Sequence, residues 1–138
     1  MSLIVKRVDV WAASIKDEPG SLACILAGLC DSGADLDFIV ARRAAEKPGT
    51  GVVFVTPLRG DNEIAAAVEL GFNVTNSLHS VRIEGDNKPG IASELTKKLA
   101  KAGINLRGLS AAVIGPKFIF YIALDNEKDA ESAVKILR

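Results

Sequence analysis

Two short stretches, DEPGSL at 17–22 and DNKPGI at 86–91, hold the residues best suited to binding a small charged molecule. In each, a Pro-Gly pair stands immediately before an apolar pattern typical of a helix. Proline keeps the residue before it extended, and glycine lacks a Cβ, so a ligand can approach the main chain. The first N–H groups of a helix have no partner within the helix and favour a carboxylate. The chemistry that these loops predict is therefore binding of a small anionic group.

Four polar side chains belong to the same pattern. Asp17 and Asn87 lie two residues before each proline, and Asp35 and Asn105 lie two residues after a glycine where each helix should end. An amide can donate to a carboxylate, and a carboxylate can hold an ammonium group. A purely structural role as turn residues is an equally good reading of each of the four. With the loop residues, the candidate ligand-binding set is Asp17, Pro19, Gly20, Asp35, Asn87, Pro89, Gly90 and Asn105.

Residue patterns for catalysis or metal binding are missing from the sequence. His79 is the single histidine, and the two cysteines, Cys24 and Cys30, are six residues apart without a CxxC pair. Neither a phosphate-binding G-x-x-x-x-G-K-[ST] nor a G-x-S-x-G motif occurs. We therefore expect no enzyme activity, no metal and no cofactor.

The two stretches mark an internal repeat. An offset of 70 in the numbering superposes Pro19 on Pro89, and GADL at 33–36 on GINL at 103–106. Beyond the next strand the best offset is 66, which aligns Phe54 with Phe120 and Ala67 with Ala133. A hairpin loop four residues shorter in the second copy, IGPK against AAEKPGTG, explains the change. Because self-similarity over a whole supersecondary unit is a strong signal, we divide the chain into repeats at 1–77 and 78–138.

Each repeat should fold as β-α-β-β-α-β, the ferredoxin-like unit, with helices on one face of an antiparallel sheet. Alternating or continuous apolar runs predict strands at 8–15, 36–43, 52–57 and 72–76, and at 78–83, 106–114 and 118–124. Asp61 or Asn126 should cap the second helix of each repeat. The second repeat ends without its last strand, so its sheet edge is expected to be covered by the other repeat, by another subunit, or left short. The fold class is thus α+β, two repeats side by side.

Composition excludes several classes of protein. Apolar residues make up 49% of the 138 residues, which is enough for a core. The net charge is zero without a basic run, which argues against nucleic-acid binding. No stretch approaches 18 apolar residues, so we expect a cytoplasmic protein that does not enter membranes.

The order strand, D/N-x-P-G, helix, G-x-N/D-L, strand resembles the ACT domain family, and the resemblance covers the chain twice. The resemblance implies a regulatory module that pairs side by side with another and binds an amino acid at their interface. It pairs Asn87 with Asp35 and Asp17 with Asn105 around a ligand. The amide-amide pattern of amino-acid-binding members occurs in the second repeat alone.

The leading hypothesis is a sensor of a small amino acid, a homodimer, that acts on a metabolic enzyme or regulator. The alternative is a non-catalytic structural or interaction subunit without a ligand. In that case the sheet edges and apolar helix faces would contact a partner.

Overall fold

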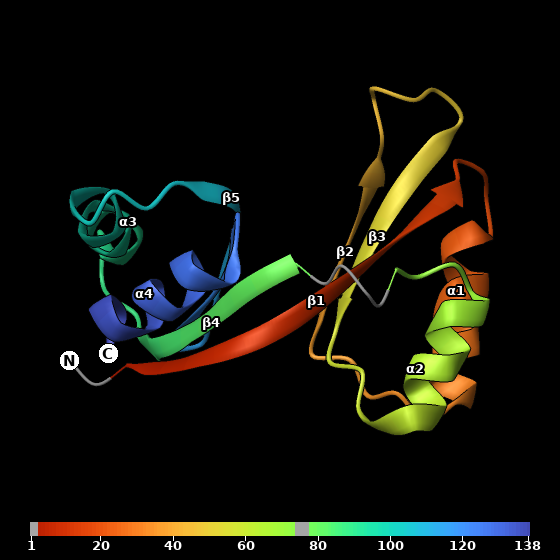
Figure 1. The fold of residues 1–138 in the computed structure, drawn as a ribbon, viewed down its shortest axis with the longest axis horizontal. Helices are drawn as coiled ribbons and strands as arrows, with labels where there is room; N and C mark the ends of the chain where they lie inside the picture. The colour runs from red at the N-terminus through yellow and green to blue at the C-terminus, as the bar shows by residue number, and fades with distance from the viewer. Residues whose placement is uncertain (1–2, 74–77) are drawn as a thin grey trace. The chain divides into compact units, whose positions relative to one another are not determined.

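The computed structural model describes residues 3–73 and 78–138, which form two compact units. We call Asp9–Ser77 the first-repeat unit, and Met1–Val8 together with Leu78–Arg138 the second-repeat unit. The expected α+β class with β-α-β-β-α repeats is confirmed (Figure 1). The elements in chain order are β1 (Ile4–Lys16), α1 (Ser21–Asp31), β2 (Phe38–Arg43), β3 (Thr50–Thr56), α2 (Gly60–Glu69), β4 (Leu78–Asp86), α3 (Ile91–Lys101), β5 (Leu106–Ile114), β6 (Lys117–Leu124) and α4 (Glu127–Leu137).

The first-repeat unit is an antiparallel sheet in the order β2-β3-β1, with α1 and α2 on one face (Figure 1). Alternate residues of the paired strands point toward the helices, because successive side chains of a strand point to opposite faces. Ala13 and its cross-strand partner Val53 are such a pair. The buried core consists of Ala13, Ile25, Leu29, Val53, Val55, Leu58, Ala67 and Phe72.

The predicted fourth strand of the first repeat, at 72–76, is observed only at its start. Phe72 forms an isolated antiparallel bridge with Ala13, and the Asn73 N–H donates to the carbonyl of Ala12 at 3.1 Å. The rest of that prediction falls on residues 74–76, which lie outside the described residues. The bridge lies on the side of β1 that β3 leaves open.

The second-repeat unit fills its missing strand position with the start of the chain. Its sheet has the order β1-β4-β6-β5, so the first residues of β1 lie on the side of β4 that β6 leaves open. Val5 is 4% exposed and belongs to this unit's core, and the Arg138 guanidinium donates to the Val5 carbonyl at 3.2 Å. The first-repeat unit therefore begins at Asp9 rather than at the expected residue 1, because burying Val5 holds the start of the chain in the other core.

The strand register corrects one detail of the sequence alignment. Lys16 pairs with Thr50, and Asp86, its counterpart in the second repeat, pairs with Lys117. The third strands therefore correspond from Thr50 to Lys117, an offset of 67, and Phe54 matches Tyr121. The offset of 66 is wrong for this strand, since an error of one residue exchanges the two faces of a sheet. The hairpin loop is thus shorter by three residues.

Helix starts follow the predicted pattern in one repeat only. The Asn126 side chain accepts a hydrogen bond from the Asp129 N–H at 2.8 Å, so Asn126 caps α4 as expected. Asp61 does not cap α2, since the residue at the cap position is Arg59, whose N–H donates to Glu63 Oε1 at 2.8 Å. Gly60 begins this helix with φ at +80°, which places Asp61 already inside its first turn.

Candidate functional site

The two Pro-Gly loops have the same backbone geometry. Gly20 and Gly90 adopt φ of 89° and 83°, each directly before a helix. The N–H that follows each glycine donates back across the turn, Ser21 to Glu18 at 3.3 Å and Ile91 to Lys88 at 3.2 Å. Proline at the second position and a positive φ at the third make each a type II turn, which requires glycine. The repeat seen in the sequence is thus a repeat of local geometry.

The residue two before each proline ties its loop to the neighbouring hairpin. The Asp17 N–H donates to the Gly49 carbonyl at 3.0 Å, and the Asn87 N–H donates to the Pro116 carbonyl at 2.8 Å. The Asp17 carboxylate also accepts from Arg43 Nε at 2.6 Å. That carboxylate, a predicted ligand contact, already has a cationic partner.

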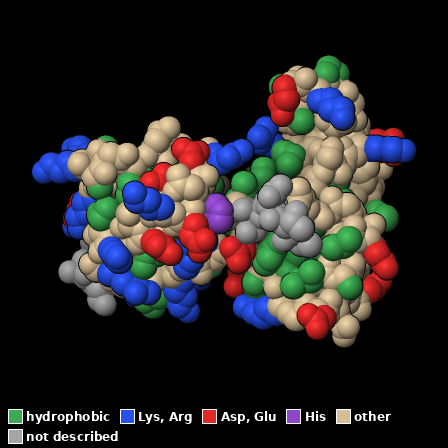
Figure 2. All heavy atoms as spheres, in the orientation of Figure 1, with side chains coloured by type: hydrophobic (Ala, Val, Ile, Leu, Met, Phe, Trp, Pro, Cys, Tyr) green, Lys and Arg blue, Asp and Glu red, His purple; other side chains and the backbone are tan. Residues whose placement is uncertain are grey.

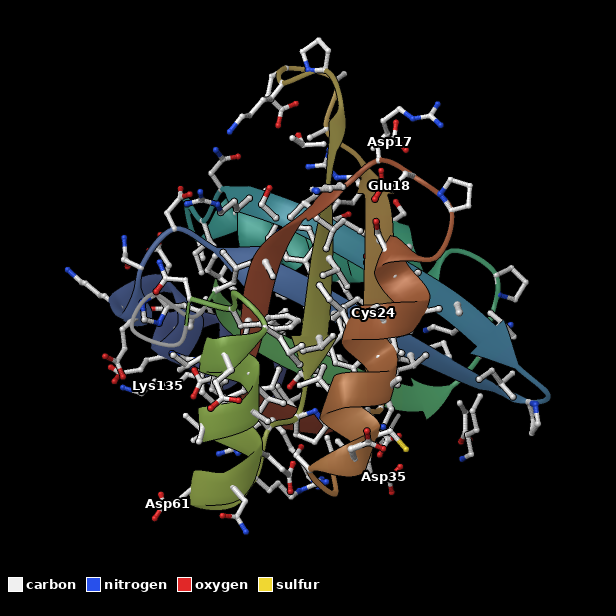
Figure 3. The ribbon with its side chains drawn as sticks, turned by 90° about the vertical axis from the view of Figure 1, so that its right-hand side faces the viewer. Asp17, Glu18, Cys24, Asp35, Asp61 and Lys135 are labelled. Atoms are coloured by element: carbon white, nitrogen blue, oxygen red, sulfur yellow. The ribbon has the colours of Figure 1, made fainter. Side chains whose placement is uncertain are left out.

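The residues after the helices lie far from the loops of their own unit. Figure 3 shows Asp17 and Asp35 at opposite ends of α1. At 1.5 Å per residue, the 11 residues of α1 span about 16 Å. Asn87 and Asn105 flank α3, which is of equal length, in the same way. No pair of predicted polar residues within one unit can therefore share a small ligand. The pairs Asn87 with Asp35 and Asp17 with Asn105 join residues of different units and stay predictions.

A hollow of about 460 Å³, open to solvent, adjoins the Pro-Gly loop of the first-repeat unit. It lies where the end of β1, the loop and the first turn of α1 meet. Figure 3 shows Glu18 and Cys24 on the loop and the helix that border it. Its lining residues are Ser14, Ile15, Lys16, Glu18, Pro19, Gly20, Ser21, Cys24 and Ile25.

Of this lining, Pro19 and Gly20 were predicted from the sequence, whereas the polar residues around them were not. Lys16 and Glu18 bring opposite charges to the hollow, and Ser14, Ser21 and Cys24 bring hydroxyl and thiol groups. These residues are less than six positions from Pro-Gly, so proximity along the chain was the signal available. Within the described part of the chain, the Lys16 and Glu18 side chains form no hydrogen bond or ion pair.

This combination suits a small zwitterion. An ammonium group can hold a carboxylate and a carboxylate can hold an ammonium group, each by charge-assisted hydrogen bonds. Ile15, Ile25 and Pro19 add apolar surface for a short side chain. Among residues 3–73 and 78–138, no group of three or more His, Cys, Asp and Glu side chains could hold a metal ion.

The surface charge on one face is mixed. Acidic and basic side chains are interspersed over the described residues drawn in Figure 2. No helix among the described residues is long and apolar enough to cross a membrane.

The family model of the ACT domain matches residues 79–138. This part of the chain matches the ACT domain. The match confirms the resemblance proposed for the second repeat, and it supports a regulatory, ligand-binding role, since ACT domains are regulatory modules rather than catalytic ones. No curated protein matches the chain by sequence.

Solved structures with the same fold extend the likeness to the whole chain. A protein from Bacteroides thetaiotaomicron superposes with a TM-score of 0.77 at 17% identity, over 95% of this chain and 88% of that one. The ligand-free regulatory subunit of aspartate kinase from Thermus thermophilus has a TM-score of 0.64 at 14% identity, over 99% and 95%. Aspartate kinase from Clostridium acetobutylicum has a TM-score of 0.63 at 16% identity, over 99% of this chain and 33% of that enzyme. The architecture around the ACT domain thus occurs both as a separate subunit and as part of a longer chain.

Proposed function

We propose that this protein is a regulatory sensor that binds a small amino acid in the hollow beside the first Pro-Gly loop. The observation that carries the proposal is the pair of side chains Lys16 and Glu18, which bring opposite charges, unpaired among the described residues, to one small cavity. The ligand carboxylate would form an ion pair with the ammonium group of Lys16 and accept hydrogen bonds from N–H groups at the start of α1. The ammonium group of the ligand would form an ion pair with the Glu18 carboxylate.

The proposed output is a change in assembly or in contacts with a partner, since binding alone can shift a population between two arrangements. The partner class that we infer is an enzyme of amino-acid metabolism, because the similar folds include an aspartate kinase and its regulatory subunit. Cys24 and Cys30 are free and exposed, which suits the reducing cytoplasm.

A homodimer is part of the proposal. Strand β5 is an edge of its sheet and exposes Leu109, Val113 and Ile114 at 45%, 55% and 73%. Exposed apolar residues on an unpaired edge strand favour pairing with another chain. The same observation favours the second candidate function, an interaction subunit that works without a ligand.

Thermal unfolding with each of the twenty amino acids at millimolar concentration tests the first function. A ligand at 100 times its Kd should add about 2.7 kcal/mol of stability, a shift of roughly 10 °C or more for a unit of this size. Lys16→Met and Glu18→Gln should each reduce the shift without lowering the melting temperature of the free protein. Lys97→Met, an exposed lysine on α3, is the matched control.

No shift with any amino acid, together with a stable dimer, would favour the interaction subunit. A shift that survives both Lys16→Met and Glu18→Gln would place the ligand elsewhere.

A further inference from the structure

We infer that each chain binds one ligand, in the first repeat, and that the second repeat has closed the matching place with its own side chains. This inference rests on the proposed function and adds to it the number of ligands that each chain binds. The two repeats differ at three places around their loops when their residues are matched by the strand register.

The first difference lies in the sheet beneath the loops. Ile15, which lines the hollow, pairs across the strands with Gly51, and the matching pair in the second repeat is Gly85 with Phe118. Phe118 is 1% exposed and packs edge to face with Phe120, their ring centroids 5.0 Å apart. Across this pair the first repeat carries an isoleucine beside a glycine, whereas the second carries a glycine beside a buried aromatic ring, the larger of the two side chains.

The second difference lies at the first residue of the helix. Ser21 begins α1 and lines the hollow. Its counterpart Ile91 begins α3, is 5% exposed and belongs to the same buried cluster as Phe118. An isoleucine turned into the core leaves no hydroxyl group at this place and fills volume that the serine does not.

The third difference spans the mouth of the loop. Glu18 and Cys24 both line the hollow, and a carboxylate and a thiol cannot form an ion pair. Their counterparts Lys88 and Glu94 do form one, with Nζ and Oε2 2.9 Å apart. This bridge joins the residue before Pro89 to the first turn of α3. The hydrogen bond from Lys88 also lowers the pKa of the Glu94 carboxyl.

The two loops have the same backbone geometry. Because of the three differences, however, the first is open to a ligand and the second is closed by its own side chains. In the second repeat, the counterparts of Lys16 and Glu18 are Asp86 and Lys88. Each already has an ion-pair partner, Lys117 for Asp86 and Glu94 for Lys88. The sequence pattern of two amides, Asn87 and Asn105, favoured the second repeat. The side chains around the loops instead favour the first repeat as the binding site.

An exchange of the loop-mouth residues tests this inference. Glu18→Lys with Cys24→Glu transfers the ion pair of the second repeat to the first, and Lys88→Glu with Glu94→Cys is the reciprocal control. All four positions are exposed, so both variants should fold, which circular dichroism and the melting temperature verify. Isothermal titration uses the amino acid that gives the largest thermal shift.

We expect wild-type protein to bind one ligand per chain. The first variant should bind at least tenfold more weakly, and the reciprocal variant should bind as wild type does. Two ligands per chain, or loss of binding in the reciprocal variant alone, would overturn the inference while leaving the sensor function intact. No binding of any of the twenty amino acids to wild-type protein would instead overturn the sensor function, and the inference with it.

Discussion

Replacing Gly51 with alanine should destabilise the first-repeat unit, because the new methyl group meets the main chain. A Cβ at this position would lie 2.9 Å from the Arg42 carbonyl oxygen and 3.3 Å from Ile15 Cγ1. The oxygen belongs to β2, whose hydrogen bonds with β3 fix its position. Overpacking of this kind costs about 1–3 kcal/mol, and the lower chain entropy of unfolded alanine returns about 0.5–1 kcal/mol. We expect a net loss of about 1–2 kcal/mol in the free energy of unfolding.

Gly28→Ala in α1 is the matched control, since its Cβ would be just as close to a neighbour. The neighbour here is Leu70 Cδ1 at 2.8 Å, the end of a side chain that can turn away. Alanine in a helix gains about 0.5–1 kcal/mol over glycine, and a leucine pushed off its rotamer loses about 0.5–1.5 kcal/mol. The two nearly cancel, so Gly28→Ala should change stability by less than about 1 kcal/mol.

Urea denaturation followed by circular dichroism measures both variants, and thermal unfolding provides a second reading. For a domain of this size, each kcal/mol corresponds to a shift of about 4–8 °C in melting temperature. A clash at the Arg42 carbonyl is ruled out if Gly51→Ala is as stable as wild type, or if Gly28→Ala is the more damaging of the two. Either result would mean that the main chain of β2 shifts more easily to make room for a methyl group than the side chain of Leu70 does.

Three further predictions concern the second-repeat unit. Asn126→Ala removes the acceptor for the Asp129 N–H and should lower the free energy of unfolding by about 1 kcal/mol in urea. Leu99→Ala empties a site that is 2% exposed and should cost about 2–5 kcal/mol by the same measurement. Lys88 lowers the pKa of Glu94 from the ordinary value of 4.5, so this contact stabilises the fold above pH 4.5 and is lost as pH falls through the folded pKa. Carboxyl NMR titration of Lys88→Met should show the Glu94 pKa rising toward 4.5, and an unchanged pKa would mean that the ion pair is absent in solution.

Much of the fold was predictable because its signals are local. Glycine at Gly20 and Gly90 is required by the positive φ of a type II turn, and an apolar stripe marks each helix within a few turns. Asn126 caps a helix with its own side chain, which is a signal carried by a single residue. Local signals of this kind can be recognised without a structure, and the Pro-Gly turn and the helix stripe occur in both repeats.

The features that were missed depend on pairing between distant residues. No glycine or proline interrupts Ile4–Lys16, so nothing in the sequence near Val8 indicates that β1 passes from one core to another. The true offset between the third strands appears only in the register, where Tyr121 rather than Phe120 matches Phe54. The hollow was missed although its lining residues are close in sequence, because only the structure shows that strand, loop and helix meet around Lys16 and Glu18.

The sharing of β1 also has a consequence for synthesis on the ribosome. The segment Ile4–Val8 is synthesised before Asp9–Ser77, yet the core that buries Val5 needs strands whose synthesis begins only at Leu78. At about 5–20 residues per second, this segment waits roughly 4–14 s for its partner, while Asp9–Ser77 can already fold. A ribosome-bound nascent chain should therefore contain a folded first repeat that carries an apolar strand end without a partner. The second repeat therefore depends for its completion on Ile4–Val8, a segment synthesised well before it.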